Sequence, residues 1–234
     1  MTERERDLIL IQAKKFFKEN IVAKHLEKTK KLCLDQFNIN PFTHKYLSNF
    51  ALGNDDSVSM AKILIYPRVL GTSISTIFGS QLQSFCNNVL DAYGSTTSGI
   101  DIEFIDTEDR RRKYCQLKSG PQTINKDDVK TIKDHFGAIK NLARTNHLDV
   151  RTSDCIVGIF YGERKDLSSC YKEIDKEYPV YIGAEFWSHL TGDMSFYEKL
   201  IEAFSDVADE VDGSAVLNEI IMNVAREIDD KINE

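Results

Sequence analysis

Hydrophobic residues recur at two different spacings along the chain. Near both ends, and between residues 76 and 92, apolar positions are three or four residues apart, which is typical of amphipathic helices. From residue 99 to residue 118 apolar and polar residues alternate instead, which is typical of strands with one buried face. The change of spacing therefore predicts a β-hairpin in the middle of a helical chain.

The other elements are predicted from the same spacings and from capping and turn residues. Helices are expected over 4–31, 76–92, 126–145, 168–176, 184–190, 195–208 and from Ser214 to the end. Asn125 is expected to cap the helix over 126–145. Strands are expected over 99–106, 113–118, 154–162 and 178–183. This order predicts an α/β (α+β) protein with a central mixed sheet flanked by helices. We expect one compact domain made of a helical region (1–60), a core (61–200) and an acidic helical region (201–234).

The composition is that of a folded globular protein. Of the 234 residues, 41% are hydrophobic, 29% are charged and only 4 are proline, which excludes a disordered or fibrous chain. The five cysteines are far apart and form no CxxC pair, so we expect reduced thiols and no zinc site. No stretch approaches the roughly 18 apolar residues of a membrane span. We therefore expect a cytoplasmic protein with no membrane partner.

The distribution of charge changes what the net charge implies. A net charge of −7 argues against a nucleic-acid partner, because phosphate contacts need lysine and arginine. However, residues 198–234 hold eleven Asp or Glu and only three Lys or Arg. Residues 110–146 show the reverse, with ten Lys or Arg and three Asp. A local basic segment on a mildly acidic chain is compatible with binding DNA or RNA.

The polar face of the predicted hairpin carries the clearest chemistry. Alternation places Asp101 and Glu103 on one face of the first strand, and Gln116 and Lys118 on one face of the second. If these faces coincide, they suit Mg²⁺ beside a phosphate, because this ion prefers oxygen ligands and a lysine can position the attacking water. Alternation alone favours a plainer alternative, a solvated hairpin face without a site. The turn over 119–121 and the basic helix that follow favour the site.

A series of short motifs runs through the middle of the chain. SGIDIEFID followed by YCQLKSGP resembles the core of PD-(D/E)xK nucleases, in which an Asp begins one strand and a (D/E)xK triplet lies on the next. Together with YPRVLGTSISTIFGSQLQ, GPQTINKDDVKTIKDHF, VGIFYG and EFWSHLTGD, this hairpin resembles type II restriction endonucleases of the group that cuts interrupted GGNCC-type sites. The resemblance covers residues 63–200. It implies Mg²⁺-dependent, sequence-specific cleavage of double-stranded DNA that leaves 5′-phosphate ends.

The resemblance also implies roles for the hairpin residues. Asp101 would bind the metal, Lys118 would be the catalytic lysine, and the Leu117 carbonyl would be a further metal ligand. Gln116 occupies the acidic position of the triplet, a departure from the family pattern that resembles the QxK of Mrr-like enzymes. Because a neutral amide is a poorer Mg²⁺ ligand than a carboxylate, either Gln116 or Glu103 is expected to complete the site.

Contacts with DNA are expected from the basic helix and from the serine-rich segment before the hairpin. Lys126, Lys130 and Lys133 are spaced to share one side of a helix, which we expect to lie beside the site and to contact phosphates. The full set of expected DNA contacts is Arg68, Ser73, Ser75, Lys126, Lys130, Lys133, His135 and Arg144.

Cleavage of both strands of a palindromic site implies a homodimer, because a two-fold dimer matches the symmetry of the DNA. The final helix carries an apolar stripe that would either join two subunits or pack within its own chain: Ile220, Ile221, Val224, Ile228 and Ile232. The resemblance further implies a cognate DNA methyltransferase. Two alternatives stay open: a repair or modification-dependent nuclease on the same core, and a DNA-binding protein whose catalytic site has decayed.

Overall fold

The computed structural model describes residues 1–90, 92–95 and 97–233, and the chain forms two compact units. Unit 1 comprises Met1–Phe16 and Gly79–Asp206, and unit 2 comprises Phe17–Phe78 and Val207–Glu234. Each unit is thus assembled from two separate stretches of the chain. The three domain ranges expected from the sequence remain a prediction about folding units.

Unit 1 is organised around a five-stranded mixed sheet with the strand order β1-β2-β3-β4-β5. The strands are β1 (Tyr93–Gly94), β2 (Ile102–Ile105), β3 (Arg112–Lys118), β4 (Cys155–Ile159) and β5 (Val180–Ile182). The first three are antiparallel neighbours, whereas β4 and β5 run parallel to β3. This sheet confirms the predicted fold class and is consistent with a PD-(D/E)xK-like nuclease core. The two-residue strand β1 was not predicted, because only its pairing with β2 makes it a strand.

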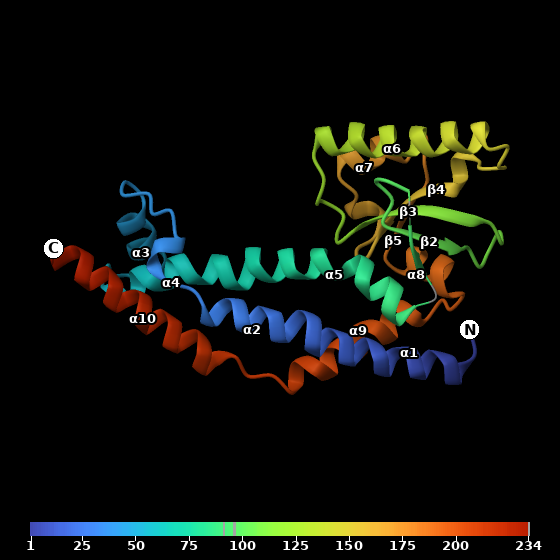
Figure 1. Cartoon of the computed structure of the whole chain (residues 1–234). Coiled ribbons are helices and arrows are strands. Elements are labelled where there is room, and N and C mark those ends of the chain that lie inside the picture. Colours follow the sequence, from blue (N-terminus) through green and yellow to red (C-terminus); the bar gives the residue numbers. More distant parts are fainter. Residues whose placement is uncertain (91, 96, 234) are drawn as a thin grey trace. The chain divides into compact units, whose positions relative to one another are not determined.

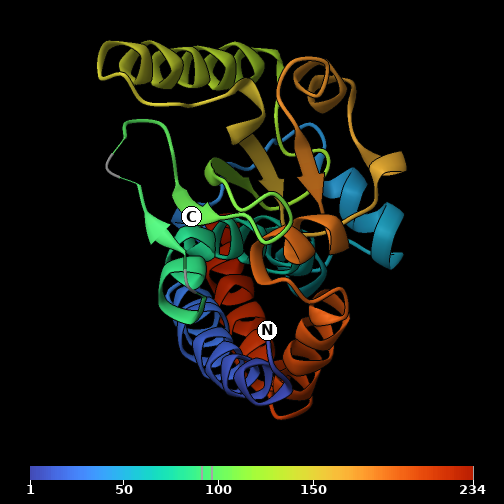
Figure 2. The ribbon, with the colours of Figure 1, turned by 90° about the vertical axis from the view of Figure 1, so that its right-hand side faces the viewer.

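Helices cover both faces of this sheet (Figure 1). They are α1 (Glu3–Phe16), α5 (Ile74–Val89), α6 (Lys126–Thr145), α7 (Ser169–Ile174), α8 (Ala184–Thr191) and α9 (Phe196–Asp209), with α5 and α9 each crossing the boundary of the unit. The long helix α6 and the short helix α7 lie over one face, and α8 lies on the other (Figures 1 and 2). Short 3₁₀ turns occupy Thr152–Asp154 and Arg164–Asp166.

The interior strand β4 explains how tightly the layers pack. Every residue of β4 is buried, as its continuous apolar sequence predicts for a strand covered on both faces. On one face Val157 and Ile159 join a core cluster with Ile132 and Phe136 of α6. On the other face a Cβ at Gly158 would lie 2.4 Å from the Phe186 ring, so only glycine lets α8 approach the sheet this closely.

The start of α6 is fixed by a capping box, which confirms Asn125 as the predicted cap. The Asn125 side chain accepts hydrogen bonds from the backbone N–H groups of Asp127 and Asp128, at 2.8 and 3.0 Å. In return the Asp128 carboxylate accepts the Asn125 N–H at 2.8 Å. Such reciprocal bonds satisfy backbone donors that a helix start leaves unpaired. They also hold Asp128 in place close to the end of β3.

Unit 2 is helical and contains α2 (Ala23–Lys30), α3 (His44–Leu52), α4 (Ser57–Pro67) and α10 (Ser214–Asn233). Two π-helical turns (Phe17–Val22 and Arg68–Ser73) and one 3₁₀ turn (Leu34–Gln36) complete it. Helix α4 was not among the predicted elements, because its buried residues Ser59, Ala61 and Ile65 form no clear apolar stripe.

The apolar stripe of α10 packs within its own chain. Ile220, Ile221, Val224 and Ile228 belong to a buried cluster with Ala61 and Ile65 of α4. The side chain of Ile232 lies outside the described residues. The stripe is therefore part of the core of unit 2. No helix in the described part of the chain combines the length and the apolar character needed to span a bilayer.

Candidate active site

A pocket of about 250 Å³ opens in unit 1 where the loop before β2, the strand β3 and the helix α6 meet. Its lining comprises Gly99, Ile100, Asp101, Gln116, Lys118, Asp128, Thr131, Ile132 and His135. Three of the four hairpin residues singled out from the sequence, together with His135, are therefore brought to one place. The fourth hairpin residue, Glu103, does not line this pocket.

The pairing of β2 with β3 explains why the hairpin residues meet. Ile102 pairs with Cys115, so the preceding residue, Asp101, lies opposite Gln116. The Asp101 N–H donates to the Cys115 carbonyl at 3.1 Å, and the Asp101 carboxylate accepts the Leu117 N–H at 2.7 Å. Gln83 of α5 donates its side-chain amide to the Asp101 carbonyl at 2.7 Å. These bonds fix both the backbone and the side chain of Asp101.

Burial dominates the electrostatics of Asp101. It raises the pKa of this carboxyl, while the Leu117 N–H, Lys118 and His135 only partly oppose the shift. A carboxylate in such surroundings gains from a bound cation, which offsets the cost of burying the charge. The pocket is thus suited to an ion that binds Asp101 directly.

The donor set of the pocket fits Mg²⁺ better than it fits a softer metal. Within the described residues no group of three or more His, Cys, Asp or Glu side chains is placed to hold a metal ion. The pocket instead offers the carboxylates of Asp101 and Asp128 and the amide of Gln116. Mg²⁺ is commonly bound by one or two carboxylates together with waters and phosphate oxygens, and it needs no cage of protein ligands.

Gln116 is 5% exposed, and its amide nitrogen has two partners. It donates to the Gly99 carbonyl and to Nδ1 of His135, the latter at 2.8 Å. Because a carbonyl can only accept, the contact with Gly99 places the amide nitrogen, and not the oxygen, on this side. The amide oxygen is therefore the group that Gln116 can offer to a ligand.

Glu103 lies on the same strand face as Asp101 but is engaged elsewhere. Its carboxylate accepts the Ser95 hydroxyl at 2.8 Å and forms an ion pair with Arg112 at 3.1 Å. Leu117 directs its N–H to Asp101, and its role as a carbonyl ligand stays a prediction.

The basic residues of α6 lie on a different flank from the pocket residues. An α-helix turns by about 100° per residue, so Lys126, Lys130 and Lys133 fall on one side of the buried Phe136 stripe. By the same rotation Asp128, Thr131 and His135, all of which line the pocket, fall on the other side. Lys126, Lys130 and Lys133 therefore do not line the pocket, and their contacts with DNA phosphates stay a prediction.

The expected DNA contacts also differ in how free their side chains are. Lys126, Lys130 and Arg144 are exposed. Lys133 instead lies 3.6 Å from the carboxylates of both Glu173 and Glu177.

The serine-rich segment belongs to unit 2. There Arg68 and Ser75 are exposed, and Ser73 is half-buried. DNA contacts by these three residues stay a prediction.

Three pocket residues were missed by sequence reasoning. Asp128 and Thr131 precede His135 by seven and four residues, a helical spacing that marks one face. Asp128 had been considered only as an acid within the basic segment. Gly99 was treated as the first residue of a strand, yet its φ of +80° and its carbonyl shape the site.

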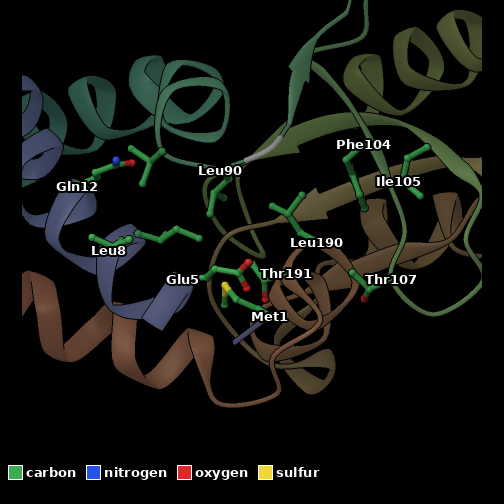
Figure 3. A pocket seen from close by; sticks show the side chains of 12 residues that line it. Met1, Glu5, Leu8, Gln12, Leu90, Phe104, Ile105, Thr107, Leu190 and Thr191 are labelled. Carbon is green, nitrogen blue, oxygen red and sulfur yellow. The ribbon is translucent and has the colours of Figure 1, made fainter. Parts of the chain in front are cut away.

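A larger cavity of unit 1, about 580 Å³, offers different chemistry. It is lined by α1, the end of α5, β2 and the end of α8, and Figure 3 shows Leu8, Leu90 and Leu190 among its side chains. Glu5 is the acidic side chain of this lining. The described residues of this lining include no lysine and no second acid, so they do not provide the groups that the smaller pocket brings together.

Comparison with known families accounts for most of the chain. The family model described as type II restriction endonuclease EcoO109I matches residues 12–212. A comparison with curated proteins gave no match. The matched range includes the hairpin, α6 and every residue that lines the 250 Å³ pocket. The chain therefore belongs to the EcoO109I family of type II restriction endonucleases and is a site-specific deoxyribonuclease.

Proposed function

We propose that the chain cuts both strands of duplex DNA in a Mg²⁺-dependent reaction that leaves 5′-phosphate ends, at an interrupted site of the GGNCC type. The observation that carries the catalytic part is the convergence of Asp101, Gln116 and Lys118 on one pocket. The GGNCC part rests on the resemblance of the motif series alone.

Each pocket residue has a chemical task in this proposal. Mg²⁺, when bound, would polarise the scissile phosphate and acidify the attacking water. Asp101 binds the cation through its carboxylate, and Gln116 adds its amide oxygen. Lys118 orients the water and stabilises the negative charge that develops on the phosphate. Leu117 provides the N–H that holds Asp101, and its carbonyl is proposed as a further ligand.

Glu103 is the less favoured candidate to complete the metal site. Its ion pair with Arg112 and its bond to Ser95 would both have to break before it could reach a cation near Asp101. The two candidates are separated by Mg²⁺ titration of cleavage. Gln116→Ala should need more Mg²⁺, whereas Glu103→Gln should follow the wild-type curve.

A plasmid cleavage assay tests the catalytic assignment. Asp101→Ala and Lys118→Met should each lose cleavage by at least about 10³-fold, as expected when the main metal ligand or charge-stabilising donor is removed. Both variants should still bind DNA. Glu103→Gln is the matched control, because it changes a carboxylate on the same strand face outside the pocket. Full activity of Asp101→Ala would contradict the assignment.

We also propose a homodimer and a cognate DNA methyltransferase. One copy of the pocket cuts one strand, so a two-fold dimer is the simplest arrangement that cuts both strands of a palindrome. Sedimentation at micromolar concentration should give about twice the chain mass. A monomer that cuts both strands in one binding event would contradict the dimer. DNA methylated at the cleavage site should resist cutting if a cognate methyltransferase protects it.

The neutral residue at position 116 favours one alternative, a DNA-binding protein that has lost catalysis. The same plasmid assay decides this, because such a protein would bind DNA with no metal-dependent cleavage. A modification-dependent nuclease would instead cut only methylated plasmid.

A further inference from the structure

Gln116 stands where a nuclease triplet usually has an acid, and its surroundings explain the exchange. Both partners of its amide nitrogen present acceptor atoms, the Gly99 carbonyl oxygen and His135 Nδ1. An amide has two N–H groups to donate, whereas an ionised glutamate has none. A carboxylate at this position would face two acceptors in a site that is 5% exposed. The two acceptors would then lose their hydrogen bonds, and this loss destabilises a buried site most because water cannot replace the missing donors.

Gly99 and His135 depend on each other in this arrangement. A Cβ atom at Gly99 would lie 2.3 Å from Cγ and Nδ1 of the His135 ring, so any side chain at residue 99 would displace the ring. The φ of +80° at Gly99 is also readily adopted only by glycine. Because residue 99 has no side chain, the imidazole of His135 can pack directly against its backbone. In this position His135 Nδ1 and the Gly99 carbonyl both contact the amide nitrogen of Gln116.

The bond from Gln116 also selects the tautomer of His135. Since Nδ1 accepts the amide N–H, the ring proton lies on Nε2. Thr131 lines the same pocket, but its hydroxyl donates to the Asp127 carbonyl at 3.0 Å. His135 is the helix residue that reaches the triplet.

We propose that Gly99 and His135 are positioning residues. They accept the two N–H groups of the Gln116 amide and so orient its oxygen to bind the cation, which makes glutamine the residue suited to position 116. This inference rests on the proposed Mg²⁺ site, because the oxygen has this task only if a cation binds beside Asp101. His135 itself contacts neither the metal nor the scissile bond in this role.

Mn²⁺ binding to the full chain, followed by electron paramagnetic resonance, tests the proposal without relying on cleavage. Asp101→Ala is the reference variant and should abolish binding at the site. His135→Ala should weaken Mn²⁺ binding roughly five- to tenfold, the effect of losing one hydrogen bond. His135→Asn should restore near wild-type affinity, because the asparagine oxygen can accept close to where Nδ1 lies. Asn141→Ala, an exposed change on the same helix, should have no effect.

The exchange of glutamine for glutamate gives the sharper test. Gln116→Glu should bind Mn²⁺ more weakly than wild type, although a carboxylate is the better ligand in isolation. Adding His135→Asn should recover part of the loss, because the asparagine amide can turn and donate to the carboxylate. Thermal unfolding of each variant shows whether a loss of binding merely reflects a loss of fold.

A metal-free readout completes the design. In wild type the side-chain N–H₂ signal of Gln116 should exchange slowly with solvent deuterium, and in His135→Ala it should exchange at least about tenfold faster. Tighter Mn²⁺ binding by Gln116→Glu with His135 intact would overturn the proposal. So would unchanged binding in a folded His135→Ala while Asp101→Ala has lost it, in which case the metal site itself stands. If Asp101→Ala keeps its binding, the metal site fails, and the inference fails with it.

Discussion

Nδ1 of His135 lies 2.8 Å from the amide nitrogen of Gln116, which joins the helix α6 to the first position of the Gln116-Leu117-Lys118 triplet. The hairpin alone supplies a carboxylate, an amide and an amine on one face. The helix α6 adds His135, which accepts a hydrogen bond from the Gln116 amide. It also places a second carboxylate, that of Asp128, in the lining of the pocket. The pocket proposed as the catalytic site is therefore a product of the packing of α6 on the sheet.

The contact between Gly99 and His135 predicts a strong effect of a single methyl group. Gly99→Ala should lower the free energy of unfolding by about 1–3 kcal/mol, because the new Cβ meets the imidazole and the φ is unfavourable for alanine. It should also reduce cleavage at least tenfold by displacing His135. Urea unfolding and plasmid cleavage measure the two effects. Gly137→Ala on α6 is the control: its Cβ would meet nothing within 4 Å, so stability should rise by about 0.5–1 kcal/mol.

The two kinds of lysine on α6 should differ in DNA binding. Lys126→Ala and Lys130→Ala should each flatten the dependence of log K on log salt by about one charge, because both side chains are exposed and free to meet phosphates. Lys133→Ala should change the slope less, since Glu173 and Glu177 already neutralise it. Equal slopes for all three variants would show that the ion pairs of Lys133 do not persist on DNA. Salt titrations by fluorescence anisotropy provide the measurement.

His189 should make stability depend on pH. Its Nδ1 lies 2.9 Å from both carboxylate oxygens of Asp106. Burial lowers the pKa of His189, but Asp106, with Glu108 and Glu185, outweighs burial and raises it overall. The contribution of the His189–Asp106 pair to the free energy of unfolding is thus complete below the unfolded pKa of histidine, about 6.5. It is lost as pH rises through the higher pKa of His189 in the folded state.

Urea unfolding between pH 6 and pH 9 should therefore show a decline in the wild type from this pair. In His189→Gln the decline should be smaller, and the variant should be less stable at pH 6 by roughly 1.5–3 kcal/mol. Parallel curves for the two proteins would assign the pH dependence to other groups.

Lys113 is a buried cation whose removal should be severe. Its ammonium lies 2.5 Å from Asp109, 3.7 Å from Asp106 and 3.6 Å from Asp154, and its side chain is 1% exposed. Lys113→Ala should lower the free energy of unfolding by about 3–5 kcal/mol, because it removes the cation shared by three carboxylates, two of which, Asp106 and Asp154, are buried. The adjacent residue Arg112 provides the control. Arg112→Ala should lower the free energy of unfolding by less than about 1 kcal/mol, because the Arg112 side chain is exposed. Denaturant melts of the two variants provide the comparison.

The stripe of α10 should act on the fold before it acts on assembly. Val224 is fully buried beside α4, so Val224→Asp should destabilise unit 2 by at least about 3 kcal/mol. Met222 on the same helix is 45% exposed, and Met222→Asp should leave the fold intact. Circular dichroism and sedimentation together separate unfolding from dissociation. A folded but monomeric Val224→Asp would restore the stripe as a subunit interface.

The sequence by itself determined the local part of the site. Strand residues alternate between two faces, so spacing alone placed Gln116 and Lys118 on one face of their strand and Asp101 on one face of the strand before it. The pairing of β2 with β3 then showed that these two faces coincide. Asn125 as a helix cap and β4 as a buried strand were read in the same way. These features depend on backbone geometry within a few residues.

Only the tertiary structure decided how each helix and strand face is oriented and which residues pack against it. Spacing placed the lysines of α6 on one side, but the burial of Phe136 against the sheet set that side away from the pocket and turned His135 toward Gln116. Glu103 shared a face with Asp101, yet Arg112 took its carboxylate. The stripe of α10 was visible as apolar, but its partner α4 was not. The spacing of residues along the chain defines the face of a helix or strand. Which side chains pack against that face depends on segments distant in the sequence, which the burial of the whole hydrophobic core brings together.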